Sequence, residues 1–409
     1  MRDSVLTIKL HSVKNFLLAA FVTCYFSVNY FEGVYRYLWL AVRLAWYAVA
    51  VLYIWNQRKV RLWSGFIPSI IILLFSMITL TYNFEHLDNS LVMLGQVLIV
   101  AFDLWLILAS TQDKKEMQFV WRGLFLGGVI AAVNQLMQID LSDIEEMGLS
   151  VERYTISETL FVNSYAYHLF VSFLAGYYLI IREKDANNRL LIKSMIVIGM
   201  IVVVLNIFFT GSRKILIAIP VFLLFATCYG KKIFWRLLLI AALVVGIYYL
   251  IMEVPALYNI IGFRIESLLM GEGDESAIER NQLMKDAFET GLFHPWGVGI
   301  DNSKYYSTTR QVYAHNNYLE LFADFGWIGV ICYYVYYVKI LHRAVRNKFN
   351  YSSSMRNFYL ACIVVLILIE VFQVVYYNFA YHLTIAALSL ALIDSDGIRT
   401  FSQSSCAEP

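Results

Sequence analysis

Long apolar runs, separated by short polar segments, recur along most of the chain. Runs of about 16 to 24 residues are long enough to cross a bilayer as helices, whereas the strands of a membrane barrel are about ten residues long and alternate in polarity. The pattern therefore predicts an all-α integral membrane protein with about twelve transmembrane helices, forming a single polytopic domain over residues 1–409. The predicted spans are 15–31, 34–55, 66–82, 91–109, 120–138, 159–181, 194–210, 215–229, 237–252, 316–338, 358–376 and 379–393.

Basic residues follow the alternation of these loops. Lys and Arg occur near both termini and in every second loop between them, whereas the intervening loops, such as 82–90 and 139–158, are acidic or nearly uncharged. Loops rich in Lys and Arg stay on the cytoplasmic side of a membrane. Both termini are therefore predicted to be cytoplasmic.

The composition agrees with a membrane protein and excludes several other classes. Hydrophobic residues make up 60% of the chain and charged residues 15%, where soluble domains carry about 25% charged residues. With a net charge of +2 and no sustained basic stripe, nucleic acid is not an expected partner. The five cysteines form no CxxC pair, and no acidic cluster has the spacing of a metal site, so neither a metal nor a cofactor is expected.

One external loop, residues 253–315 between the ninth and tenth spans, is far longer than the others. Loops of this length are usually functional or disordered, and its aromatic residues and amphipathic stretch favour an ordered, functional loop. In the stretch 274–291, Arg280 lies on the apolar face of a predicted helix, between Ala277 and Met284. This arginine either extends to a lipid phosphate or points into a cavity that binds a phosphate group.

Two further cations, Arg213 and Lys214, follow a tight external turn at Gly211 and Ser212. Ser212 is expected to cap the helix that begins there. The two cations either face lipid headgroups or bind an anion, and an anion is favoured because this side of the membrane is otherwise poor in positive charge.

His315 lies at the external mouth of the tenth span. The free N–H groups at a helix start disfavour a positive charge there, so a neutral imidazole is available to accept a proton near pH 7. A helix-capping or hydrogen-bonding histidine is the alternative. Glu320 and Asp324 follow on one face of the same helix, and are expected to face the protein interior, where they serve a site or a buried donor.

These segments together resemble the O-antigen ligase/polymerase superfamily of bacterial cell envelopes. The resemblance rests on GSRK at 211–214, Arg280 within a long external loop, HPWGVG at 294–299 and AHNNYLELFADFGWIG at 314–329, in this order. It implies a glycosyltransferase of the bacterial inner membrane that uses undecaprenyl-diphosphate-linked oligosaccharide, with an active site on the periplasmic face. His315, Arg280 and Arg213 are then the expected catalytic residues. The expected substrate-binding residues are Arg264, Lys214, Asn316, Tyr318 and Glu320.

Three functions fit these observations. A repeat-unit polymerase is preferred, because HNNYLELFADFGWIG is most similar to the polymerase branch; a ligase that transfers the finished glycan to lipid A-core or to a protein is the main alternative. A transporter is less favoured, since no inverted repeat with matched broken helices is evident. The resemblance also implies a chain-length regulator and a flippase as partners.

Overall fold

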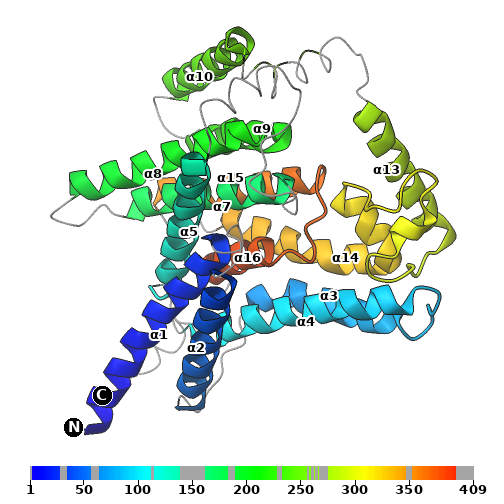
Figure 1. The fold of residues 1–409 in the computed structure, drawn as a ribbon, viewed down its shortest axis with the longest axis horizontal. Coiled ribbons are helices and arrows are strands. Elements are labelled where there is room, and N and C mark those ends of the chain that lie inside the picture. Colours follow the sequence, from blue (N-terminus) through cyan, green and yellow to red (C-terminus); the bar gives the residue numbers. More distant parts are fainter. Residues whose placement is uncertain are drawn as a thin grey trace. The chain divides into compact units, whose positions relative to one another are not determined.

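A computed structural model describes residues 2–27, 35–56, 64–111, 115–138, 162–182, 189–227, 233–255, 258, 262, 266, 275–346 and 352–392. Within this part of the chain every regular element is a helix, and no strand occurs (Figure 1). The packing of the chain divides it into two compact units, and each unit is assembled from segments that are distant in the sequence.

Unit 1 comprises residues 1–60, 110–272 and 352–362. In this unit α1 packs against α2 and α5, α5 packs against α7 and α8, and α7 also contacts α8 and α9. Among the described helices of unit 1, α7 is the most deeply buried, as expected for an apolar helix that is surrounded by others. The helices of unit 1 are α1 (Arg2–Ser27), α2 (Tyr35–Asn56), α5 (Met117–Gln138), α7 (Val162–Arg182), α8 (Arg189–Phe209), α9 (Arg213–Thr227), α10 (Ile233–Glu253) and the first half of α15 (Ser353–Glu370).

Unit 2 comprises residues 61–109, 273–351 and 363–409. The long helix α14 organises this unit, because it contacts α3, α13, α16 and η4. The described elements of unit 2 are η2 (Ser64–Phe66), α3 (Ile67–Thr79), α4 (Leu87–Ser110), α13 (Glu275–Phe293), η4 (Ser303–Tyr306), α14 (Asn317–Arg346), the second half of α15 and α16 (Phe379–Leu392).

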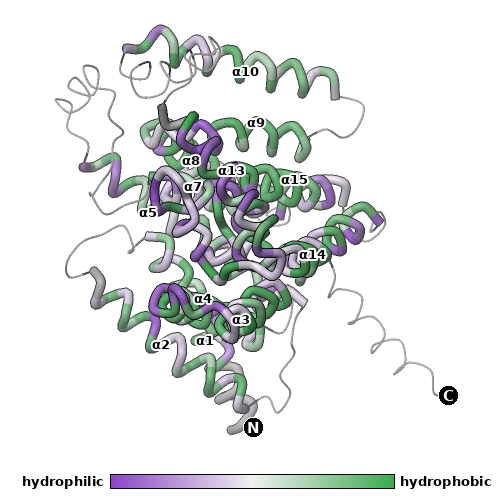
Figure 2. Tube along the Cα trace, turned by 90° about the vertical axis from the view of Figure 1, so that its right-hand side faces the viewer, coloured by the Kyte–Doolittle hydropathy of each residue, from purple (hydrophilic) through white to green (hydrophobic). Residues whose placement is uncertain are grey.

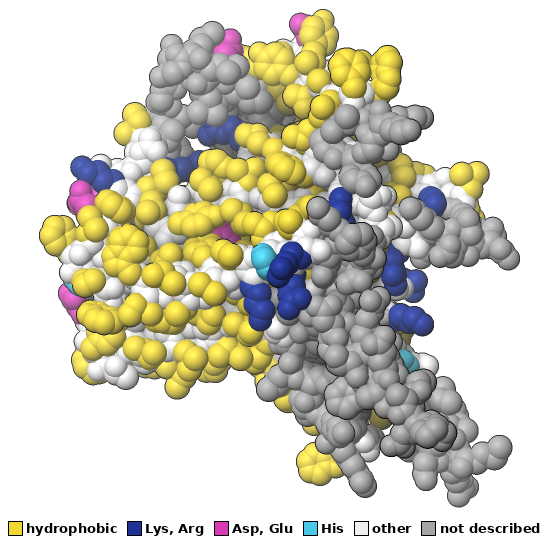
Figure 3. Space-filling view, turned by 180° about the vertical axis from the view of Figure 1, so that it is seen from behind, with side chains coloured by type: hydrophobic (Ala, Val, Ile, Leu, Met, Phe, Trp, Pro, Cys, Tyr) yellow, Lys and Arg dark blue, Asp and Glu magenta, His cyan; other side chains and the backbone are white. Residues whose placement is uncertain are grey.

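Each of the predicted apolar runs coincides with a helix, and the all-α membrane class is confirmed. In the described part of the chain, seven helices are long and apolar enough to cross a bilayer, while α3, part of α10 and α16 are shorter apolar helices. Helices such as α9 and α10 are hydrophobic along most of their length (Figure 2), and hydrophobic side chains cover much of the face drawn in Figure 3. The total of about twelve spans stays a prediction.

Several helix boundaries differ from the predicted ones, and buried contacts accompany two of these differences. Helix α1 begins at Arg2 instead of residue 15, and its Lys14 is fully buried with its Nζ 2.8 Å from the Glu116 carboxylate. Helix α15 ends at Glu370 instead of residue 376. The backbone N–H groups of Val375 and Tyr376 leave the helical pattern and donate to a buried asparagine of α14, described below.

Helix α14 is broken at Gly326, where φ is +68°. A Cβ atom at Gly326 would lie 2.0 Å from the Pro295 carbonyl oxygen, so only glycine permits the loop HPWGVG to approach the helix this closely. Beside the break, the N–H groups of Val298 and Gly299 donate to the carbonyls of Ala323 and Asp324, both at 2.9 Å. The break thus separates a half that is joined to the loop, 317–325, from the half 327–346.

Replacing Gly326 by alanine should destabilise the protein strongly. With φ at 68° and ψ at −172°, the new residue would hold a backbone conformation that is essentially restricted to glycine, at a cost of about 1–3 kcal/mol, and its side chain would collide with Pro295. Gly95 in α4 is the matched control, because a Cβ there has no atom within 4 Å and alanine favours a helix by about 1 kcal/mol. Thermal unfolding in detergent should show a lower midpoint for Gly326→Ala and an equal or higher one for Gly95→Ala. Equal midpoints for Gly326→Ala and wild type would contradict the role of this close contact.

Candidate functional site

The loop between α13 and α14 is held in place by a carboxylate of α14. Glu320 is fully buried, and one of its oxygens accepts the backbone N–H of Ala314 at 2.6 Å. Its other oxygen accepts the hydroxyl of Ser303, in η4, at 2.9 Å. As the sequence predicts, this acid faces the protein interior. Both oxygens bind donors of the loop itself, so the structure gives Glu320 a loop-positioning contact, while its predicted contact with substrate stays a prediction.

A second buried carboxylate, one helical turn further on, holds the same loop at another point. Asp324 accepts the backbone N–H groups of Asp301 at 2.9 Å and Ser303 at 3.2 Å. It also accepts the hydroxyl of Tyr376, in the turn between α15 and α16, at 2.6 Å. Charge-assisted hydrogen bonds of this kind contribute about 1.5–3 kcal/mol each, so they offset part of the cost of burying the charge.

The far side of the loop is fastened to α13. The buried carboxylate of Asp286 accepts the N–H and hydroxyl groups of Thr308 at 2.7 and 2.8 Å, and it also accepts hydrogen bonds from Ser307 and Gln282. Burial on its own raises the pKa of Asp286, but these donors outweigh it and hold the pKa below its ordinary value. Asp286 is therefore ionised at neutral pH and joins α13 to the loop.

His315 occupies an unusual backbone position in this loop. Its φ of +56° lies in the left-handed region, which residues other than glycine rarely adopt. Ala314 on one side is bonded to Glu320. Asn316 on the other side caps α14, since its side-chain oxygen accepts the N–H groups of Tyr318 at 3.0 Å and Leu319 at 3.1 Å. Hydrogen bonds on both sides thus fix His315 in a conformation that costs free energy, a feature that is common at functional sites.

Arg280 and His315 converge on Tyr313. The rings of Tyr313 and His315 have centroids 4.3 Å apart, and both His315 and Arg280 are half-buried. Burial raises the pKa of the Tyr313 hydroxyl, and the positive charge of Arg280 opposes that rise, whereas Glu320 adds to it. Arg280 therefore lies near Tyr313, the ring partner of His315, although more than 30 residues separate Arg280 from both of them in the sequence.

The other predicted residues lie elsewhere. Tyr318 is half-buried, donates its hydroxyl to the Ile367 carbonyl at 3.0 Å and stacks on Tyr334, which are contacts of packing. Arg213 and Lys214 begin α9 in unit 1, where both are half-buried. Arg264 lies outside the described residues.

The turn before α9 has the expected geometry with a different hydrogen bond. Gly211 has a φ of +59°, as a tight turn requires. The hydroxyl of Ser212, expected to cap α9, donates instead to the side chain of Asn163 on α7 at 3.4 Å. The turn is thereby joined to the neighbouring helix, and Arg213 follows directly from this buried point.

Asn317, which the sequence pattern did not predict as a site residue, is fully buried at the start of α14. Its side-chain nitrogen donates to Glu370 at 2.9 Å, and its oxygen accepts the N–H groups of Val375 at 2.8 Å and Tyr376 at 3.0 Å. Asn317 thus fastens the α15–α16 turn to the helix that begins beside His315. The one hint in the sequence is the pair Asn316-Asn317 at a predicted helix start. One asparagine is enough to cap a helix, so the second indicates another role.

Among the side chains that the structure describes, no group of three or more His, Cys, Asp or Glu is arranged to hold a metal ion. Within the same set, no carboxylate forms an ion pair with Arg280. Glu279, the neighbour of Arg280 in the sequence, pairs instead with Arg310 at 3.4 Å.

Comparison with known proteins agrees with the resemblance seen in the sequence. A family model described as O-antigen ligase matches residues 198–334, a segment that contains all the predicted site residues. This match confirms the resemblance to the O-antigen ligase/polymerase superfamily and indicates a function of the ligase or polymerase type, with a glycosyltransferase-like role. No curated protein matches the chain significantly.

Asp286→Ala should loosen the loop from α13. The substitution removes several hydrogen bonds to a charged group, and we expect a loss of about 2 kcal/mol at pH 7. Because the pKa of Asp286 is depressed, this stabilisation is present above the ordinary Asp pKa of about 3.9 and is lost as the pH falls through the folded-state pKa. The unfolding midpoints of variant and wild type, measured in detergent from pH 7 to pH 3, should therefore converge at the acid end.

Glu289 provides the matched control on the same helix. It is half-exposed and forms only a loose pair with Lys285 at 3.8 Å, and such surface pairs contribute little. Glu289→Ala should leave the midpoint close to that of wild type at every pH. A similar loss for both variants would show that removal of any α13 carboxylate, not the Asp286 contacts, causes the effect.

Proposed function

We propose that this protein is a membrane glycosyltransferase that polymerises undecaprenyl-diphosphate-linked oligosaccharide repeat units into O-antigen, capsule or exopolysaccharide. The observation that carries the proposal is the convergence of Arg280 and His315 on Tyr313, within the segment that matches the O-antigen ligase family. The nearby carboxylate of Glu320 is engaged by the loop, so the guanidinium of Arg280 has no described carboxylate partner and suits an anionic ligand.

The diphosphate of a lipid-linked donor supplies such an anion. In the proposed site Arg280 and Arg213 hold the diphosphate, because the planar guanidinium group binds two phosphate oxygens at once. Lys214, Arg264, Asn316, Tyr318 and Glu320 are proposed to contact or position the substrate around them. The arginines supply the positive charge of the site, and no metal ion takes part in the proposed reaction.

The proposed reaction is a single displacement at the sugar carbon that carries the diphosphate. A hydroxyl oxygen of the acceptor sugar forms the new bond to this carbon as the bond from carbon to the phosphate oxygen breaks. His315 accepts the proton of the hydroxyl, a role worth about 10²–10⁴-fold in rate. The diphosphate leaves with the bonding electrons, and the arginines stabilise its growing charge. One displacement inverts the configuration of that carbon.

An O-antigen ligase is the second candidate, because the matching family model is described by that activity. It would use the same donor and the same displacement, with lipid A-core or a protein as acceptor. The two candidates differ in product. A polymerase extends a lipid-linked chain, whereas a ligase leaves chain length unchanged and moves the glycan to a new acceptor.

Alanine at His315, Arg280 or Arg213 should abolish polymer formation while the protein stays inserted and abundant. Each substitution removes a group proposed to move the proton or to stabilise the leaving diphosphate. Arg213→Lys should also fail, because lysine keeps the charge but lacks the planar fork. Glycan ladders on gels, together with turnover of a synthetic lipid-linked repeat unit by purified protein, measure the effect.

Three controls test whether any loss is specific. Arg310 lies in the same loop and pairs with Glu279 at 3.4 Å, and His342 is an exposed histidine near the far end of α14. Arg310→Ala and His342→Ala should give wild-type ladders, and Lys214→Ala should retain substantial activity. A normal ladder from His315→Ala or Arg280→Ala at wild-type protein level would remove that residue from the mechanism.

The proposed topology places both termini in the cytoplasm and the active site on the periplasmic face of the inner membrane. Thr309 and Arg346 are exposed at opposite ends of the segment that contains α14. In a background without native cysteines, Thr309→Cys should react with an impermeant thiol reagent added to spheroplasts, and Arg346→Cys only after permeabilisation. The reverse pattern would place the site in the cytoplasm and overturn the proposed use of a periplasmic donor.

A further inference from the structure

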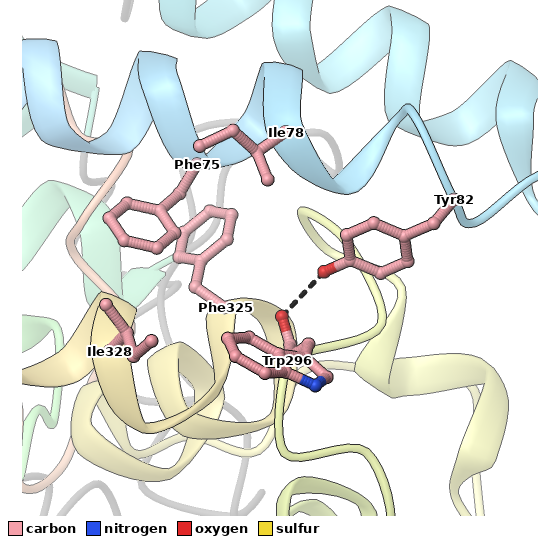
Figure 4. A pocket seen from close by; sticks show the side chains of 6 residues that line it. All are labelled: Phe75, Ile78, Tyr82, Trp296, Phe325 and Ile328. Carbon is pink, nitrogen blue, oxygen red and sulfur yellow. Dashed lines mark hydrogen bonds between the residues drawn. The ribbon is translucent and has the colours of Figure 1, made fainter.

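Unit 2 contains an apolar pocket of about 650 Å³ (Figure 4). Phe75 and Ile78 of α3 point toward Phe325 and Ile328 of α14, and the other walls are Tyr82, which follows α3, and Trp296 of the HPWGVG loop. The hydroxyl of Tyr82 is satisfied, because it donates to the Trp296 carbonyl at 2.6 Å. The lining thus offers hydrocarbon surface to a ligand.

The pocket opens to the surface of unit 2. Four wall residues remain well exposed: Ile78 at 51%, Tyr82 at 45%, Trp296 at 67% and Ile328 at 47%. Phe325 at its base is buried and lies 6.1 Å from Phe75, centroid to centroid. An open apolar pocket on a membrane protein admits a chain from the bilayer, whereas a diphosphate or a sugar would lose its hydrogen bonds there.

The pocket has a defined place relative to His315. Its α14 walls, Phe325 and Ile328, flank the break at Gly326, about ten residues from His315. At 1.5 Å per residue this separation is roughly 15 Å along the helix. After the break, residues 327–346 form a helix of about 30 Å, the thickness of a hydrocarbon core. Tyr82 and Trp296 are residue types that concentrate at membrane interfaces.

We propose that this pocket binds the part of the donor's isoprenoid chain that follows the diphosphate. The inference rests on the proposed function, which places the diphosphate beside Arg280 and His315. A chain attached to that diphosphate has to pass from the site into the bilayer, and the pocket lies in the same unit where α14 changes from its loop-bound half to its second half. Aromatic and branched aliphatic walls suit a branched, unsaturated chain. The chain bound there orients the donor so that its reacting carbon faces His315.

The experiment compares donors that differ only in lipid length. Purified full-length protein in nanodiscs receives a synthetic repeat unit on undecaprenyl diphosphate or on geranyl diphosphate. Wild type should prefer the long donor in kcat/KM. Ile328→Trp narrows the pocket and should reduce that preference about tenfold, mainly through a higher KM for the long donor. Val338→Trp, at an equally apolar and 65% exposed position of α14, is the control and should keep the wild-type preference.

A binding measurement on the wild-type protein is independent of the variants. Undecaprenyl phosphate with a diazirine in its first isoprene units should label peptides that contain Ile78, Trp296 or Ile328, and unlabelled undecaprenyl phosphate should compete. Phosphatidylglycerol with a diazirine in its acyl chain tests the other source of hydrocarbon. Equal labelling by the phospholipid without competition, or an unchanged donor preference in folded Ile328→Trp, would overturn the proposal.

The two proposals fail in different ways. If wild type transfers no glycan from either donor while the isoprenoid probe labels the pocket, the proposed reaction is wrong and the binding site stands. If wild type turns over both donors equally well and the probe labels other segments, the reaction stands and the pocket assignment is wrong.

Discussion

Buried backbone N–H groups must find acceptors, and in unit 2 the carboxylates of α14 supply them. Glu320 and Asp324 accept N–H groups from residues 314, 301 and 303. A loop outside regular structure has no ladder of its own to satisfy these donors, so without the two acids it would have to turn them toward water. The position of His315, the approach of HPWGVG to Gly326 and the walls of the apolar pocket all depend on this anchoring.

Because of these hydrogen bonds, the acids and the cations have different roles in the proposed site. Two carboxylates lie close to the proposed site, and a free carboxylate there would repel a diphosphate. Binding both Glu320 oxygens to the loop disperses that charge over hydrogen-bond donors. Arg280, whose positive charge acts on Tyr313, has no ion-pair partner among the described carboxylates. In this arrangement the acids hold the loop, and the arginine and the histidine carry the proposed chemistry. That chemistry is the departure of an anion and the uptake of a proton.

Features that depend on local periodicity were predictable from the sequence, and features that depend on distant contacts were not. Apolar runs predicted the membrane helices, and an amphipathic pattern predicted α13. Both are local signals, because the side chains that face lipid or one packed surface recur at short, regular intervals along the sequence. The break at Gly326 could not be predicted, since glycine is common inside membrane helices and only the approach of Pro295 requires it here. Position and chemistry predicted His315 and Arg280 as site residues, and this role stays a prediction. The left-handed conformation of His315 was not predictable, because it follows from contacts that form only in the folded protein.

Asn317 shows why such long-range contacts cannot be predicted from a sequence pattern. It stands next to the residue that caps α14, yet its amide spans α14, Glu370 of α15 and the turn before α16. Because Asn317 holds this turn, α15 ends early and the Tyr376 hydroxyl reaches Asp324. One asparagine thus links the end of α15 to Asp324, the acid that holds the loop. The conformation of His315 is therefore supported from both sides of α14: by α13 through Asp286, and by α15 and α16 through Asn317 and Asp324. A histidine supported in this way keeps its strained conformation without help from a ligand, which is what a pre-organised proton acceptor requires.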